Sequence, residues 1–160
     1  MKEKNYVSPI LDRIRKQTLE EDMALAHDLA LSYVKKVDDM RVFPDKKAVS
    51  NLSVFEEAFP EEPEDTKNIL NMLGKYGSPA TVAQTGGRYF GFVCGGILPS
   101  ALCSKWLSDA WDQNSALFVL SPVASKLEEV CENWLKKLLK LPDDTVAGFV
   151  SGSSTATICG

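Results

Sequence analysis

A run of small, hydroxyl-bearing residues near the end of the chain carries the clearest chemical signal. Gly152 is followed by Ser153, Ser154 and Thr155, and the apolar segment 146–150 comes just before this run. The apolar segment is short and rich in strand-favouring residues, which predicts a buried strand that leads through a turn into a helix. The first amides of a helix lack intrahelical acceptors and lie at the positive end of its dipole. The run is therefore a candidate cradle for a phosphate or another anion, with Gly152 allowing a close approach.

Two other interpretations of this run stay open. A Gly-Ser-Ser-Thr run is often only a polar loop with a helix cap. Residues 152–156 also approach the G-x-S-x-G pattern of a nucleophile elbow, with Ala156 in place of the last glycine. Ser154 would then attack an acyl carbon, which makes a serine hydrolase the alternative enzyme. A serine needs an adjacent base, and the single histidine, His27, precedes Ser154, whereas hydrolases with this elbow place the histidine after it.

The segment 86–96 is a second candidate for a functional role because of its unusual composition. It holds five glycines and three aromatic residues among eleven residues. Glycine is costly in regular structure and is kept where the backbone turns sharply or approaches another group closely. The segment is therefore either a tight crossing of chain segments in the core or one wall of a ligand pocket, where the aromatic rings supply contact area and the glycines leave room.

Helices are predicted to precede the glycine–aromatic segment. The first begins at a capping box that Thr18 forms with Glu21. Residues 41–65 predict a surface loop with one short helical turn near 54–59. A second helix begins at Asp65 and ends at 77–79. The apolar side of the first helix consists of Met23, Ala26, Ala30, Tyr33 and Val37, and that of the second of Ile69, Leu70, Leu73 and Tyr76.

Two further helices are predicted between the glycine–aromatic segment and the hydroxyl run. One begins at Leu98-Pro99 and is broken at 112–114, and a longer one begins at Ser121-Pro122 and is stopped by Leu141-Pro142. Glu132 and Lys136 form an i, i+4 pair that we place on the outside of the longer helix. The predicted inner face of the longer helix consists of Val123, Leu127, Val130, Trp134 and Leu138.

Composition and charge restrict the class of protein. The chain has 160 residues, 44% of them hydrophobic and 25% charged, which suits one globular domain or part of a larger protein. A net charge of -4 argues against nucleic acid as the main partner. No apolar run reaches the length of a membrane span, and the first residues lack the apolar core of a secretory signal, so we expect a cytoplasmic protein.

The cysteines do not predict a metal site. Cys94, Cys103, Cys131 and Cys159 form no C-x-x-C pair, and a single histidine accompanies them. We therefore expect no zinc and no other metal, and we expect reduced, buried thiols.

Five blocks of the sequence, taken together, resemble the N-terminal part of the pyridoxal-phosphate-dependent group II decarboxylases, the family of aromatic amino acid and glutamate decarboxylases. The blocks match that family in order and spacing, and the resemblance runs from about the first helix to the last residue. The blocks are residues 87–93, 106–114, 121–124, 134–135 and 148–152.

The resemblance implies an α/β fold of the aspartate-aminotransferase-like type, the type I fold of pyridoxal-phosphate enzymes. Residues 1–85 would form the helical N-terminal arm for dimerisation. Residues 86–160 would hold the substrate-side segment, helices, and the first strand and phosphate loop of the large domain. The expected parent protein is a homodimer with its active site at the subunit interface.

The resemblance also implies a reaction and the residues that serve it. The parent would be a carboxy-lyase that removes carbon dioxide from an amino acid, with pyridoxal 5'-phosphate as cofactor. Ser153 and Ser154 fall on the two adjacent phosphate-loop positions of the family. The substrate-side positions fall on Phe92, Val93, Cys94 and Gly96, where this sequence is more similar to bacterial members than to the animal enzymes.

The family's catalytic residues have no counterpart that can be assigned in this chain. These are a lysine that binds the cofactor covalently, a histidine that stacks on its ring and an aspartate that pairs with the pyridine nitrogen. We therefore expect the chain to be an N-terminal fragment that is inactive alone. The alternative is a non-catalytic remnant or dimerisation module. The sequence does not determine which amino acid the parent would use.

Overall fold

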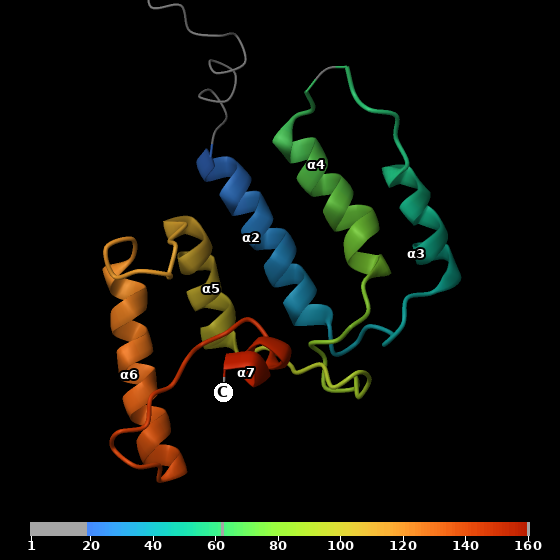
Figure 1. Ribbon diagram of the computed structural model, residues 1–160. Helices are drawn as coiled ribbons and strands as arrows, with labels where there is room; N and C mark the ends of the chain where they lie inside the picture. The colour runs from blue at the N-terminus through green and yellow to red at the C-terminus, as the bar shows by residue number, and fades with distance from the viewer. Residues whose placement is uncertain (1–18, 62, 160) are drawn as a thin grey trace, which may run out of the picture. The chain divides into compact units, whose positions relative to one another are not determined.

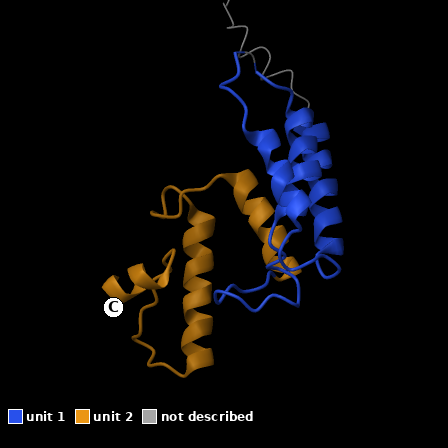
Figure 2. Ribbon diagram, turned by 90° about the vertical axis from the view of Figure 1, so that its right-hand side faces the viewer, with its two compact units in different colours: residues 1–97 blue, residues 98–160 orange. Residues whose placement is uncertain are grey.

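The computed structural model describes residues 19–61 and 63–159, and all regular structure within those ranges is helical (Figure 1). The chain divides into two compact units, residues 1–97 (unit 1) and residues 98–160 (unit 2), shown in Figure 2. The assignment of roles to residues 1–85 and 86–160 stays a prediction. No helix in the described ranges is long and apolar enough to cross a membrane.

Unit 1 is built from helices joined by irregular segments. The predicted first helix is confirmed as α2, while the Thr18 end of its capping box lies outside the described residues. The second predicted helix is confirmed from its first residue, because the Asp65 carboxylate caps it by accepting from the Lys67 amide at 2.7 Å. The chain then stays helical, through a π turn and a 3-10 turn, as far as Ala80. The elements are α2 (Leu19–Lys36), α3 (Lys46–Ser50), η1 (Asn51–Phe55), α4 (Thr66–Met72), η2 (Leu73–Gly77) and η3 (Ser78–Ala80).

The short helical turn predicted at 54–59 is wrong in position. The helical residues are 46–55, and the chain leaves helical geometry at Glu56. The physical reason is a cap that the prediction missed: the Asp45 carboxylate accepts from the Ala48 amide at 2.7 Å and so starts the helix earlier.

The core of unit 1 lies at the end of α2. Val37 is 6% exposed and Ala83 is 3% exposed, whereas Met23, at the other end of the predicted apolar face, is 56% exposed. The Ala83 amide donates to the Val42 carbonyl at 3.0 Å, which holds the chain after η3 against the turn after α2. No residue of α2 itself is buried, and the buried residue of the predicted apolar face, Val37, follows the last residue of the helix.

Unit 2 confirms the predicted helix boundaries. It contains α5 (Pro99–Trp111), α6 (Pro122–Leu139) and α7 (Ser153–Cys159). Ser121 is fully buried, and its hydroxyl caps α6 by accepting from the Ala124 amide at 3.3 Å. α5 and α6 end at residues in left-handed conformation, Asp112 and Lys140.

The predicted orientation of α6 is wrong. On its supposed inner face, Trp134 is 67% exposed and Leu138 is 76% exposed. The supposed outer pair is the protected one, because the side chains of Glu132 and Lys136 are only 26% and 17% exposed. The chain after α6 folds back on this polar side: Lys136 Nζ donates to the Asp143 carbonyl at 3.4 Å. Hydrogen bonds to backbone groups, and not apolar burial, therefore select the face that is covered.

The strand predicted at 146–150 is not formed. A strand needs a neighbouring strand for its amides and carbonyls, and no other strand occurs in residues 19–61 and 63–159. The Ala147 amide donates instead to the Glu132 carboxylate at 3.3 Å. The described part of the chain is therefore helical, and the α/β assignment is a proposal taken up below.

We predict that Gly86→Ala destabilises unit 1. A Cβ on Gly86 would lie 3.2 Å from the Val37 carbonyl oxygen and 3.4 Å from the Ala83 carbonyl oxygen, which are backbone atoms of the buried core. Crowding of this kind costs about 1–3 kcal/mol, so thermal unfolding monitored by circular dichroism should show a lower Tm. Gly95→Ala is the matched control, since a Cβ there meets nothing within 4 Å. Equal melting temperatures for the two variants would contradict this packing.

Candidate functional site

The predicted substrate-side residues lie together on one exposed turn of unit 1. The turn is closed by the Cys94 amide, which donates to the Gly91 carbonyl at 3.2 Å. Phe92 and Val93 both have left-handed backbone conformation, with φ of 53° and 56°. This conformation is rare for a β-branched residue such as Val93. Both side chains point to solvent, with Phe92 92% exposed, and Gly96 follows on the same exposed segment.

The side chain of Tyr89 packs against this turn at Gly91. A Cβ on Gly91 would lie 2.9 Å from the Tyr89 hydroxyl oxygen, so the tyrosine packs across the glycine. Loss of hydration raises the pKa of Tyr89, and the nearby Cys94 thiol raises it further. The Cys94 sulfur lies 3.8 Å from the Phe92 carbonyl oxygen. The glycine–aromatic segment is thus a folded turn with its own internal contacts.

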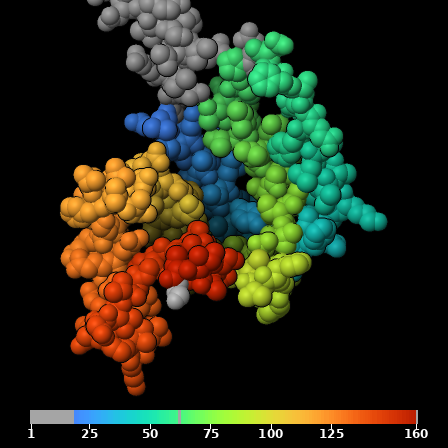
Figure 3. Space-filling model, in the orientation of Figure 1, coloured from blue at the N-terminus to red at the C-terminus, as the bar shows by residue number. Residues whose placement is uncertain are grey.

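The predicted phosphate residues lie at the start of α7 in unit 2. α7 begins at Ser153, and the Ala156 amide donates to the Gly152 carbonyl at 3.1 Å. The amides of Ser153 and Ser154 therefore belong to the first turn, ahead of that bond. Both serines are exposed, as is the rest of α7 (Figure 3). A Cβ on Gly152 would meet nothing within 4 Å, so approach to these groups is open.

This donor set fits the phosphate group of pyridoxal phosphate. Two adjacent hydroxyls and the first-turn amides are donors of the kind that hold an anion. The substrate-side residues belong to unit 1 and the two serines to unit 2. Within the described ranges, no group of histidine, cysteine, aspartate and glutamate residues is placed to hold a metal ion.

The serine hydrolase alternative stays a prediction. His27 Nδ1 lies 3.0 Å from Asp28 Oδ1 on α2, which belongs to unit 1. Ser154 belongs to unit 2, on α7.

The expectation of buried cysteines is wrong. Cys94, Cys103 and Cys159 are exposed, Cys131 is partly exposed, and all four thiols are free. The reason is that few residues of the described chain are buried at all, so even a thiol on a helix stays in contact with solvent.

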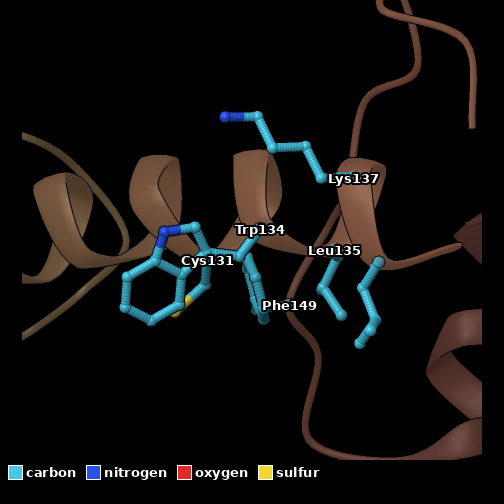
Figure 4. Close-up of a pocket in the computed structure, with 6 residues that line it drawn as sticks. Cys131, Trp134, Leu135, Lys137 and Phe149 are labelled. Carbon is cyan, nitrogen blue, oxygen red and sulfur yellow. The ribbon is translucent and has the colours of Figure 1, made fainter. Parts of the chain in front are cut away.

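A pocket of about 730 Å³ lies on α6, and the sequence did not predict it. Figure 4 shows Trp134, Cys131 and Phe149 close together below the ribbon of α6, with the side chain of Lys137 above it. The apolar stripe of α6 was visible in the sequence, but the approach of Phe149 depends on the fold-back of the chain after α6. The lining residues are Cys131, Trp134, Leu135, Lys137, Leu138 and Phe149.

The sequence did not predict two contacts between distant residues, one in each unit. In unit 1, Arg88 and Gly87 bond to Asp38, about fifty residues earlier. In unit 2, the Glu132 carboxylate, which the sequence pairs with Lys136, also accepts from the Ala147 amide. The i, i+4 spacing signalled the Glu132–Lys136 pair, but no local pattern signals a partner so distant in sequence as Asp38.

Comparison with known proteins gives distant relatives. The chain is 27% identical over 122 residues to an aromatic-L-amino-acid decarboxylase of Cavia porcellus, an alignment that covers 76% of this chain and 25% of that protein. It is 25% identical over 131 residues to tyrosine decarboxylase 2 of Arabidopsis thaliana, covering 79% of this chain and 24% of that protein. It is 23% identical over 140 residues to a 3,4-dihydroxyphenylacetaldehyde synthase of Drosophila melanogaster, covering 83% and 28%.

These matches confirm the resemblance in the sequence. The chain is a distant homologue of the N-terminal quarter of the aromatic-L-amino-acid and tyrosine decarboxylases, which are group II decarboxylases. It spans about a quarter of the length of the curated relatives it matches. No family model matches the chain, and no solved structure matches it.

We predict that acid releases the segment after α6 from that helix. The hydrogen bond from Lys136, then that from Ala147, lowers the pKa of Glu132 below its ordinary value of 4.5. A carboxylate with a depressed pKa stabilises the fold above its unfolded-state pKa, and this contribution is lost as the pH falls through the folded-state pKa. Hydrogen exchange of the Ala147 amide should therefore speed up, relative to its intrinsic rate, as the pH falls below about 4.5.

Glu132→Gln should remove most of this dependence on pH, because the amide does not titrate in this range. Glu128→Gln, on the same helix, is the matched control and should keep the dependence. An Ala147 protection factor that does not change with pH in the unaltered chain would contradict the role of Glu132.

Proposed function

We propose that the chain supplies the N-terminal part of a pyridoxal-phosphate-dependent amino acid decarboxylase with the aspartate-aminotransferase-like α/β fold. The observation that carries this proposal is the distant homology over about three quarters of the chain to aromatic-L-amino-acid and tyrosine decarboxylases. The whole parent would be a homodimer with a small amino acid as substrate, and the helices within residues 1–85 would serve its dimerisation arm.

Ser153 and Ser154 would hold the cofactor by its phosphate. Their amides lie in the first turn of α7 and their hydroxyls are exposed beside them, so both kinds of donor are available to one dianion. When bound, the cofactor's pyridine ring takes up the electron pair released as carbon dioxide leaves. In that chemistry, this chain would hold the cofactor in place, because a bound phosphate fixes the position of the pyridine ring.

Phe92, Val93, Cys94 and Gly96 would form the substrate side. The turn presents the side chains of Phe92 and Val93 outward, where they offer apolar area to the side chain of an amino acid. Gly96 adds no side chain, and a Cβ there would meet nothing within 4 Å, so it leaves room beside that area. These residues would bind and orient the amino acid and exclude water from it. We assign no catalytic residue within the chain.

We predict that the phosphate of a cofactor analogue binds at the start of α7. The probe is pyridoxamine 5'-phosphate, which lacks the aldehyde and so does not react with surface lysines. Titrated into the 160-residue chain, it should shift the amide NMR signals of Ser153 and Ser154. Pyridoxamine, which lacks the phosphate, should not shift them. Ser154→Ala should weaken the binding about tenfold or more, since a charge-assisted hydrogen bond contributes about 1.5–3 kcal/mol.

Ser100→Ala, at an exposed position on α5, is the control substitution and should leave the affinity unchanged. The proposal fails if pyridoxamine shifts the same signals as strongly as its phosphate, or if Ser154→Ala binds the probe as tightly as the unaltered chain.

A further inference from the structure

We propose that Asp38 and Arg88 are positioning residues that hold the glycine–aromatic segment in place on the substrate side. The inference rests on the proposed function, which assigns substrate binding to the turn that carries Phe92 and Val93. It adds a second role to the helical N-terminal part of the chain, whose expected role was dimerisation alone.

The first contact fixes the backbone where the segment begins. The Gly87 amide donates to Asp38 Oδ1 at 3.0 Å. The preceding glycine makes this approach possible, since a Cβ on Gly86 would lie 3.2 Å from the Val37 carbonyl oxygen and 3.4 Å from Asp38 Oδ1. Val37 is one of the few buried residues of unit 1. The segment is therefore attached beside the buried residues of this unit, Val37 and Ala83.

The second contact uses the side chain of Arg88. Its Nη2 donates to the Asp38 carbonyl at 2.6 Å and also to the Met40 carbonyl. These carbonyls lie just beyond the end of α2, where backbone oxygens have no helical partner. A planar guanidinium with several donors suits two such oxygens, whereas the ammonium of a lysine is a point charge. Both of these hydrogen bonds of Nη2 are therefore made to backbone carbonyls of unit 1.

These contacts control a turn only a few residues away. The Tyr89 amide donates to the Gly86 carbonyl at 3.3 Å, and the Tyr89 ring packs across Gly91. Phe92 is four residues from Arg88, so a fixed Arg88 confines it to within about 14 Å even if the chain is fully extended. Asp38 and Arg88 therefore set where the exposed side chains of the turn can lie.

The test is amide hydrogen exchange measured by NMR on the 160-residue chain. Asp38→Ala and Arg88→Ala should each speed up exchange of the Gly87, Tyr89 and Cys94 amides about tenfold, the effect of losing one hydrogen bond to a charged group. Amides within α2 should keep their rates. Asp39→Ala and Arg41→Ala are matched controls, because both residues are exposed neighbours of the same types, and they should change none of these rates.

Conservative variants separate positioning from a general effect on folding. Asp38→Asn keeps the Oδ1 acceptor and should preserve the protection of Gly87, while Arg88→Lys should lose part of the protection at Tyr89 and Cys94. The inference is overturned if Asp38→Ala and Arg88→Ala leave the exchange rates of the Gly87, Tyr89 and Cys94 amides unchanged. It is also overturned if Asp38→Asn speeds up exchange of the Gly87 amide as much as Asp38→Ala does. A failed titration with pyridoxamine 5'-phosphate would defeat the cofactor assignment in unit 2 and leave this result in unit 1 standing.

Discussion

Backbone groups that have no partner within a helix must find one elsewhere, and this constraint organises both units. In unit 1, the carbonyls after α2 are bonded by the Arg88 guanidinium. In unit 2, the amide of Ala147 is bonded by the Glu132 carboxylate on α6. In each case a charged side chain supplies the hydrogen bond to the backbone that a neighbouring strand would supply in a sheet. The glycine–aromatic segment of unit 1 and the segment after α6 are held in this way, because the described chain provides no sheet for them.

Apolar burial contributes less to this arrangement than the composition suggests. Val37, Ala83 and Ser121 are the buried residues within the described ranges, while large side chains such as Trp134 and Phe90 lie open to solvent. Exposed apolar surface of this extent is typical of a face that packs against other protein. It agrees with the proposal that the chain works within a larger, dimeric enzyme, and with relatives of which the aligned residues cover about a quarter.

The two candidate segments differ in how far their conformation depends on contacts with distant residues. The start of α7 offers donors that any helix start provides, so its suitability for a phosphate follows from local geometry. The substrate-side turn has left-handed Phe92 and Val93, a conformation that local preference opposes. Such a turn depends on distant support, which here comes from the contacts of Gly87 and Arg88 with Asp38.

Local sequence patterns were enough to predict helix boundaries such as those at Asp65, Ser121 and Asp112, because caps and helix breakers act within a few residues. The sequence also predicted the homology to the decarboxylases, which alignments at about 25% identity confirm. The folded structure was needed to show which face of α6 is covered and that the Ala147 amide bonds to the Glu132 side chain. It was also needed to show that Arg88 bonds to the backbone of Asp38. These outcomes depend on partners distant in sequence, so no local pattern of residues encodes them.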